Sequence, residues 1–157
     1  MVSVRGDEQR ALFRRWPAGV SIIAAEVDGR RAGLTVSSLT SLSLRPALVG
    51  ISIALAASLH DVLRDAHTWT ASLLAGDQEQ VALQFAASLP ADEAWAGVVV
   101  RDLDRRQLDG AVGWLTARTV QELSTGDHTF FVGEVISVEQ GTAPTSLAYV
   151  HRKYLRV

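Results

Sequence analysis

GLTVSSLTSLSLRPALVGISIALAAS, residues 33–58, places a run of hydroxyl side chains between two apolar segments of strand length. Serine is not a strand former and competes with the backbone for hydrogen bonds, so strand propensity does not explain the run. Hydroxyls supply neutral donors and acceptors that suit a polar ring edge, a sugar chain or a phosphate. The stretch therefore predicts a ligand-binding loop, with the alternative that its hydroxyls cap their own backbone turns. Its hydroxyl residues are Thr35, Ser37, Ser38, Thr40, Ser41 and Ser43.

Length and composition predict one globular domain over residues 1–157. Hydrophobic residues make up 48% of the chain and charged residues 20%, enough to bury a sizeable core. The formal net charge is −2 and the sequence has no basic run, so nucleic acid is not an expected partner.

The redox and membrane signals both point to a soluble, cytoplasmic protein. The sequence contains no cysteine, which excludes disulfides and thiolate chemistry and suits a reducing compartment. Its first residues, MVSVRGDEQRALFRRW, carry charges where a signal peptide needs an apolar core. The longest apolar run, residues 47–57, is too short to span a bilayer, so no membrane contact is predicted.

Apolar spacing and turn residues predict the elements of the first half. A helix is expected over 7–16 with Asp7 as its cap, a second over 58–66 capped by Ser58 with Asp61 completing a capping box, and a third over 77–88 capped by Asp77. Strands are expected over 20–27, over 47–53 and over 68–74. An Asp28-Gly29 hairpin turn leads from the first of these into a further strand that ends near Leu34.

The second half is expected to be mostly strand. Residues 95–101 are compatible with a strand and 102–110 with a charged loop, whereas 111–123 and 129–139 predict two strands joined by 124–128. A last pair of short strands is expected within 146–157. About seven strands with short connections predict a mainly β, antiparallel fold with two or three short helices, closed or nearly closed into a barrel.

The sequence offers no standard catalytic set. It lacks a G-x-S-x-G nucleophile elbow, an H-E-x-x-H metal motif and a G-x-G-x-x-G or Walker loop. His60 and His67 are expected to face solvent rather than bind a metal. His128 differs, because it follows Gly126 and Asp127 in a tight turn where an imidazole can orient or stack on a planar ligand. The alternative is a solvated hairpin histidine.

The segments taken together resemble the flavin reductase-like, FMN-binding split-barrel family over nearly the whole chain. The matching segments are FRRWPAGVSIIAA at 13–25, the G-x-T-x-S-S pattern at 33–38, SLSLRP at 41–46, VGISIALAAS at 49–58, the Q-x-x-x-A-x-x-F-A pattern at 78–86, GDHTFFVGEV at 126–135 and SLAYVHRKY at 146–154. Each is weak alone, whereas the set in this order is specific.

The resemblance implies an antiparallel, Greek-key split barrel that binds FMN or FAD and reduces it with NADH or NADPH. It implies a homodimer that supplies reduced flavin to a partner monooxygenase, with Trp16, Trp69, Trp95 and Trp114 as candidates for apolar contact surface. In this family the flavin carries the hydride chemistry, which accounts for the missing catalytic set.

The resemblance also implies roles for residues. Thr35, Val36, Ser37 and Ser38 would hold the isoalloxazine edge, with Ser43 in the same run, and Ser52, Ile53 and Ala54 would line the ribityl chain. Ser58 would bind phosphate at a helix start. His128 would position the nicotinamide, with Arg152 and Tyr154 nearby. Phe85 is a further candidate, although its apolar helical spacing favours a core position.

Departures from the family pattern leave two other functions open. Thr70 and Ala71 stand where the family often has Val-Asn, Ser146 replaces a proline, and residues 89–109 lack the usual phenylalanine-rich pattern. The first alternative is a flavoprotein that keeps FMN bound and acts directly on a small organic substrate. The second is a non-catalytic module that holds flavin or haem.

Overall fold

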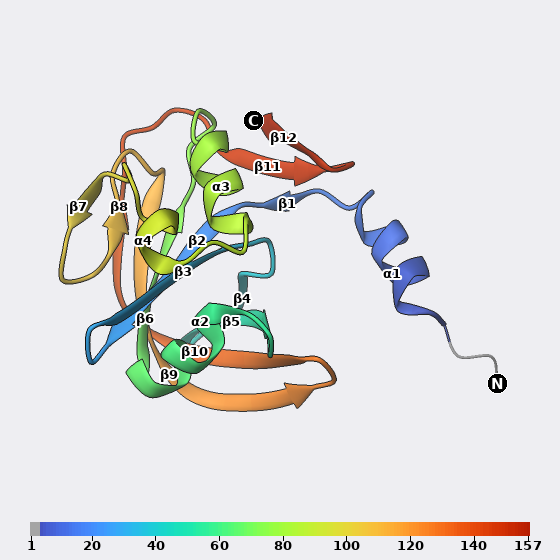
Figure 1. Cartoon of the computed structure of the whole chain (residues 1–157), viewed down its shortest axis with the longest axis horizontal. Helices are drawn as coiled ribbons and strands as arrows, with labels where there is room; N and C mark the ends of the chain where they lie inside the picture. The colour runs from blue at the N-terminus through green and yellow to red at the C-terminus, as the bar shows by residue number, and fades with distance from the viewer. Residues whose placement is uncertain (1–3) are drawn as a thin grey trace.

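A computed structural model describes residues 4–157 (Figure 1). Its helices are α1 (Gly6–Phe13), α2 (Ser58–Ala66), α3 (Glu79–Ala86) and α4 (Ala91–Ala94). Its strands are β1 (Ala18–Gly19), β2 (Ser21–Val27), β3 (Arg30–Val36), β4 (Thr40–Leu44), β5 (Ala47–Ala54), β6 (Thr68–Leu73), β7 (Val100–Asp102), β8 (Gln107–Leu108), β9 (Gly113–Thr125), β10 (His128–Gln140), β11 (Leu147–Val150) and β12 (Lys153–Arg156). The fold is mainly β, as predicted.

Seven strands form the main sheet, in the order β3-β2-β6-β9-β10-β5-β4. Every neighbouring pair in this sheet is antiparallel. The edge strands β3 and β4 follow one another in the chain but are not paired, so backbone hydrogen bonds do not close the sheet. The predicted barrel closure is therefore not observed. Two smaller sheets, β1-β11-β12 and β7-β8, complete the described strands.

The strand β2, which lies between β3 and β6, explains why the molecule has two apolar cores. Its first five residues are all buried, so both faces of the strand are covered. Because side chains alternate across a strand, Ile23 and Ala25 face one core while Ile22 and Ala24 face the other. The helix α2 packs on the first core, and α3 and α4 pack on the second (Figure 1).

Two tight hairpins set the register of the sheet. Asp28 and Gly29 join β2 to β3, and both have positive φ (50° and 73°), as a type I′ turn requires. This turn confirms the prediction. Only Gly126, at φ 73°, and Asp127 join β9 to β10. At this turn β9 ends later and β10 begins earlier than predicted, so the loop is shorter than 124–128.

The helix predicted over 58–66 is confirmed as α2, whereas the bounds predicted for α1 and α3 were wrong, and the caps of all three helices were misassigned. The N-cap positions of α1, α2 and α3 are Arg5, Ala57 and Gln78, not Asp7, Ser58 and Asp77. Asp61 bonds to His60 instead of completing a capping box. Asp77 lies in the turn that precedes α3, so this helix begins later and is shorter than predicted.

The strand count was also too low. Much of the hydroxyl run lies in strands, because β3 includes Thr35 and ends at Val36 and β4 begins at Thr40, which leaves only residues 37–39 as a connection. The short strand β7 begins at the end of the segment 95–101 that was compatible with a strand, and its partner β8 lies in the segment expected to be a charged loop. The predicted strand pair near the C-terminus is present as β11 and β12.

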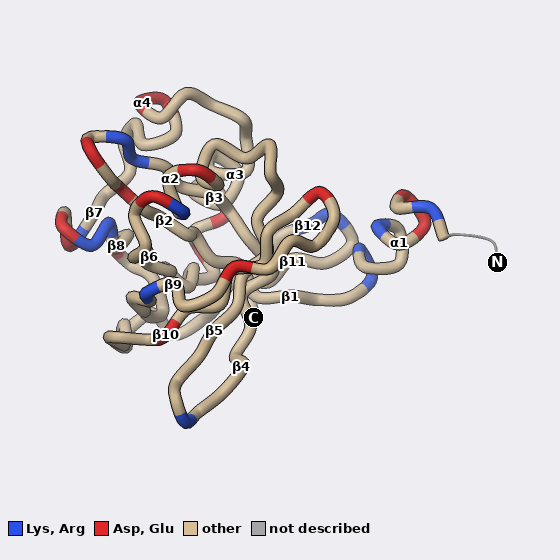
Figure 2. The backbone as a smooth tube through the Cα atoms, turned by 90° about the horizontal axis from the view of Figure 1, so that it is seen from below, with Lys and Arg blue, Asp and Glu red and all other residues tan. Residues whose placement is uncertain are grey.

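Helix α1 lies at one end of the molecule, away from the main sheet in both views (Figures 1 and 2). None of its residues is buried, and its apolar residues Leu12 and Phe13 are exposed. Its charges of both signs are interleaved, as they are elsewhere along the backbone (Figure 2). Within residues 4–157, no helix has the length and apolar character that crossing a membrane requires.

Candidate functional site

A cavity of about 440 Å³ lies beside the start of α2, and it is called the α2 cavity below. Strand β3 contributes Arg31 to Leu34, and the turn before α2 contributes Ala56 to Ser58. The segment 85–91, with Ala94 and Trp95, covers the remaining side. Two of the predicted residues, Ser58 and Phe85, therefore line one cavity.

Gly33 allows the close approach of two rings to β3. A Cβ atom at this position would lie 2.6 Å from the Phe85 ring and 3.2 Å from the Trp95 ring. These two rings pack edge-on with centroids 4.9 Å apart. The glycine of the G-x-T pattern thus leaves the floor of the α2 cavity flat and apolar.

The α2 cavity also carries positive charge at one side. The Arg31 guanidinium lies 5.1 Å from the centre of the Trp95 ring, in the range of a cation–π contact. The α2 helix has no side-chain cap at its N-terminus, so its first N–H groups and its dipole are available to an anion. A planar apolar group with an anionic tail fits these surroundings.

A second cavity, of about 540 Å³, lies between α1 and the β9–β10 turn and is called the His128 cavity. It brings together Ser52 and His128, which are 76 positions apart in the sequence but lie on the paired strands β5 and β10. Thr125 and Asp127 add polar groups from the turn, while α1 closes the cavity with Gly6, Gln9, Arg10 and Phe13.

The His128 imidazole is held by its neighbour and remains accessible. Its Nδ1 lies 2.7 Å from Oδ1 of Asp127, and its side chain is 40% exposed. This hydrogen bond is the main reason that the pKa of Asp127 lies below its ordinary value. Because a carboxylate only accepts, Nδ1 donates and Nε2 stays free for a ligand. The register pairs His128 with Ala54, another predicted site residue.

Three of the predicted hydroxyls already bond to the protein backbone. Thr35 donates to the carbonyl oxygen of Ala82 at 2.6 Å, which ties β3 to α3. Ser38 bonds to both backbone groups of Ser52, and Ser43 accepts from the amide of Arg45 at 3.3 Å. The alternative interpretation, that hydroxyls cap the backbone, therefore holds for these three side chains.

Three other predicted residues turn their side chains into the cores. Val36 and Ile53 belong to the first core and are 6% and 0% exposed. Phe85 belongs to the second core at 1% exposed, as its spacing favoured. Val36 and Ile53 can therefore reach a ligand only through backbone groups, whereas Ser37 is exposed and Ala54 half-buried.

Arg152 and Tyr154 lie on the β11–β12 hairpin and line neither of the two cavities. Arg152 sits in the turn at φ 63° and is exposed. The Tyr154 ring packs against Tyr149 with centroids 5.0 Å apart, and its partial burial raises the pKa of Tyr154. The structure does not bring these two residues beside His128.

A larger cavity, about 810 Å³, lies at the opposite end of the β9–β10 hairpin from His128. None of the predicted site residues lines it. Of its two arginines, Arg101 and Arg156, the first is already paired with Glu139 at 2.5 Å and stacked on Trp114 at 4.1 Å. Size alone therefore does not identify the site.

The prediction that His60 faces solvent is wrong, although His67 is exposed as expected. His60 is 3% exposed and bonds to Asp61 and to Thr129. It lies three positions before Leu63 on α2, so it borders the apolar stripe of the helix. This position beside the apolar stripe was the signal in the sequence that His60 would be buried.

The likeness to known proteins agrees with this geometry. The family model for the flavin reductase like domain matches residues 13–157. The chain belongs to the flavin reductase-like family, and the resemblance seen in the sequence is confirmed.

Two curated relatives cover most of the chain. The NADH:FMN oxidoreductase of Rhodococcus qingshengii is 34% identical over 157 residues, which span 95% of this chain and 80% of that protein. The reductase component of 4-hydroxyphenylacetate 3-monooxygenase from Thermus thermophilus is 34% identical over 143 residues, 91% of each chain.

Solved structures show the same fold. The NADH:FAD oxidoreductase of Streptomyces globisporus has a TM-score of 0.89 at 29% identity, with 100% of this chain and 96% of that chain covered. A structure of that protein in complex with NAD and FAD fragments has a TM-score of 0.87 at 28% identity and covers 100% and 97% of the two chains.

Proposed function

We propose that the protein is an NAD(P)H-dependent flavin reductase, which transfers hydride from NADH or NADPH to FMN or FAD. The observation that carries this proposal is the α2 cavity, where two aromatic rings and a small-residue floor adjoin Arg31 and an uncapped helix start. A flavin has a planar apolar ring system at one end and phosphate at the other, which matches both parts. The family and the relatives named above support the same activity.

In this proposal the flavin phosphate binds near Ser58 and Arg31 at the start of α2. Helix N–H groups and a guanidinium are both suited to phosphate. Backbone groups of residues 35–38 and 52–54 hold the ring and the ribityl chain, because most of their side chains are already engaged in bonds or in the core. Ser37 is the hydroxyl of this set that is exposed.

His128 is proposed to position the nicotinamide. Its free Nε2 can accept a hydrogen bond at the edge of the His128 cavity, and Ser52 of the paired strand lies in the same cavity. The flavin accepts the hydride when bound, so the protein has to align two rings and exclude water. His128 is therefore assigned an orienting role rather than proton transfer.

Reduced flavin would pass to a partner monooxygenase. Several relatives are reductase components of monooxygenases, among them the one from Thermus thermophilus and the 4-nitrophenol monooxygenase reductase of Rhodococcus opacus. A flavin that is a substrate rather than a retained cofactor has to leave, and the openness of both cavities to the surface suits such release. The cytoplasm, predicted from the sequence, remains the proposed location.

We further propose a homodimer in which α1 packs on the second subunit. Leu12, Phe13 and Trp16 of this segment are 67%, 61% and 72% exposed. A helix of eight residues is not stable in water without packing, so this apolar surface needs a partner. Trp69, Trp95 and Trp114 are at most 6% exposed, which leaves Trp16 as the contact tryptophan. Dimerisation that survives Trp16→Glu in sedimentation would argue against this contact.

The finer description of the sheet is likewise a proposal. Its edge strands β3 and β4 are consecutive in the chain and flank the residues assigned to the flavin. An opening between two such strands suits a Greek-key split barrel, where a flavin would lie across the gap. Experiment can distinguish the reductase from the two other functions. These are a flavoprotein that acts directly on an organic substrate and a non-catalytic module that holds flavin or haem.

The deciding assay measures NADH and NADPH oxidation with FMN, FAD and riboflavin added separately. Flavin lost on dialysis, together with oxidation that needs added flavin, supports the reductase. Retained flavin that reacts only with an organic substrate favours the first alternative. A bound chromophore without any nicotinamide oxidation favours the module.

A further inference from the structure

His60 is a buried imidazole within the apolar layer between α2 and β10. It is 3% exposed, and its ring meets the Phe131 ring edge-on with centroids 5.7 Å apart. Burying a polar ring is unfavourable unless its nitrogens are hydrogen-bonded, and an aliphatic side chain would fill such a position without that requirement. The hydrogen bonds of His60 therefore indicate the role of a histidine at this buried position.

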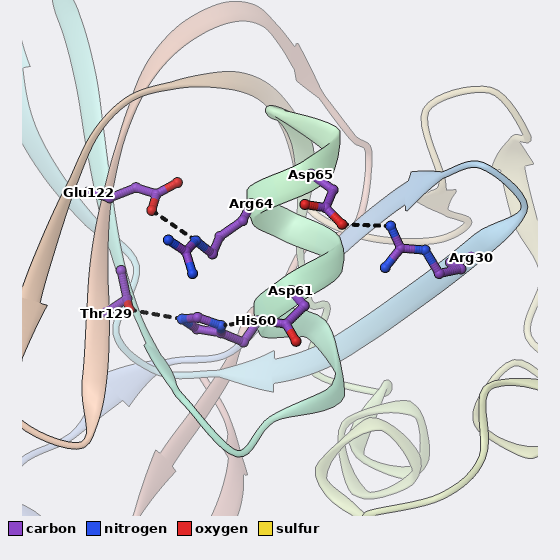
Figure 3. Close-up of polar contacts among 7 residues, drawn as sticks. All are labelled: Arg30, His60, Asp61, Arg64, Asp65, Glu122 and Thr129. Atoms are coloured by element: carbon purple, nitrogen blue, oxygen red, sulfur yellow. Dashed lines mark hydrogen bonds and ion pairs between the residues drawn. The ribbon is translucent and has the colours of Figure 1, made fainter.

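Both ring nitrogens are satisfied, and their roles are distinct (Figure 3). Nδ1 lies 3.0 Å from Oδ1 of Asp61, and Nε2 lies 2.8 Å from Oγ1 of Thr129. The bond to His60 is the main reason that the pKa of Asp61 lies below its ordinary value, so this carboxylate is ionised and accepts. Nδ1 consequently donates to Asp61, and Nε2 accepts the hydroxyl hydrogen of Thr129.

The bond to Thr129 is the buried one among three polar links between α2 and the sheet (Figure 3). Arg64 pairs with Glu122 of β9 at 3.2 Å, and Asp65 pairs with Arg30 of β3 at 2.6 Å. Both of these ion pairs are largely exposed, and exposed pairs fix geometry weakly. The His60–Thr129 bond is therefore the buried polar link between the first turn of α2 and β10, beside the apolar packing of the helix.

This bond joins the two cavities of the site. Ser58 of the α2 cavity precedes His60 by two positions, and His128 precedes Thr129 by one. We propose that His60 is a positioning residue, which holds the phosphate-binding turn and His128 at a fixed separation so that flavin and nicotinamide align. The inference rests on the proposed function, because it presumes what the two cavities bind.

Two substitutions at Thr129 test the bond without changing the buried volume much. Thr129→Val keeps the shape and removes the hydroxyl, whereas Thr129→Ser keeps the hydroxyl. With purified protein, the measurements are the FMN dissociation constant, and kcat and KM for NADH at saturating FMN. Thr129→Val is expected to lower kcat/KM about tenfold, because small misalignment of reacting groups costs rate, while Thr129→Ser stays near wild type.

Substitutions at His60 give the reciprocal test. Gln can place an amide near the position of Nε2 and keep the bond to Thr129, whereas Asn is too short and keeps only the bond to Asp61. His60→Gln is expected to restore most of the activity that His60→Asn loses. The double variant His60→Asn with Thr129→Val is expected to have the kcat/KM of the less active single variant. Both substitutions remove the same hydrogen bond, so their effects should not add. Arg64→Gln, which cuts an exposed link of the same helix, is the control and should leave kinetics unchanged.

The outcomes separate this inference from the proposed function. Variants that lower the melting temperature but keep wild-type FMN affinity and NADH kinetics would overturn the positioning role and leave a purely structural bond. Equal behaviour of His60→Gln and His60→Asn would overturn it as well. If wild-type protein binds FMN without oxidising NADH, the reductase proposal fails, and FMN affinity across the same variants then decides the positioning role.

Discussion

Ser38 and Ser52 form a reciprocal pair: the Ser38 hydroxyl accepts from the Ser52 amide at 3.0 Å and donates to the Ser52 carbonyl oxygen at 3.2 Å. One side chain thus satisfies both backbone groups of a residue 14 positions away. The pair fixes the connection between β3 and β4 against β5, where the main sheet is not closed. The hydroxyl that the sequence assigned to a ligand therefore shapes the backbone that would bind the ligand.

Ser38→Ala should lower both stability and flavin affinity. Leaving the partly buried amide of Ser52 without its partner costs about 1–3 kcal/mol in the free energy of unfolding. Urea unfolding measures this cost, and fluorescence titration with FMN measures affinity. Ser37→Ala, at the exposed neighbour, is the matched control for stability. Loss of affinity with unchanged stability would instead mean that the Ser38 hydroxyl contacts flavin directly.

Arg31→Gln should weaken FMN binding while leaving riboflavin binding unchanged. FMN loses a charged hydrogen bond from Arg31 to its phosphate, which corresponds to about a tenfold change in affinity. Riboflavin has no phosphate and loses no such bond. Arg105→Gln, in the exposed β7–β8 turn, controls for the loss of one positive charge. Equal weakening of FMN and riboflavin would assign Arg31 to the ring stack with Trp95 rather than to phosphate.

The stability difference between wild type and Asp61→Asn should depend on pH. Because the hydrogen bond from His60 lowers the pKa of Asp61 below 3.8, its contribution is fully present above that value and disappears as the pH falls through the lowered pKa. Melting curves from about pH 6 to about pH 3 should show a constant gap that narrows only at the acid end. A gap that instead narrows near neutral pH would contradict this sign. Asp104→Asn, an exposed aspartate, is the control.

His128→Ala should retain flavin and lower kcat/KM for NADH by about ten- to a hundredfold, because the side chain aligns the nicotinamide but transfers no proton. Steady-state kinetics at saturating flavin measure the effect. Asp127→Asn, which weakens the hold on Nδ1, should give a smaller loss in the same direction. Wild-type kcat/KM in His128→Ala would make His128 an ordinary hairpin residue.

Local signals in the sequence predicted local structure well. The Asp28-Gly29 turn, the helix over 58–66 and the strand over residues 47–53 follow from residue types within a few positions of each other, and the structure contains all three. The order of family segments also named residues that the structure brings into shared cavities. Ser58 and Phe85 share one cavity, and Ser52 and His128 share the other.

Long-range partners could not be predicted in the same way. The Thr35 hydroxyl bonds to Ala82, and His60 bonds to Thr129, at separations of 47 and 69 positions. Such pairs depend on which strands lie side by side, and no local pattern specifies that. The exposure of α1 was unpredictable for a related reason, since Leu12 and Phe13 cover no apolar surface within residues 4–157.

The most direct test of the central claim is anaerobic mixing of the FMN-loaded protein with NADH. The account predicts that the flavin absorbance band bleaches within the turnover time and that the reduced flavin is then lost on gel filtration. Flavin that binds but stays oxidised in the presence of NADH and of NADPH would contradict the account.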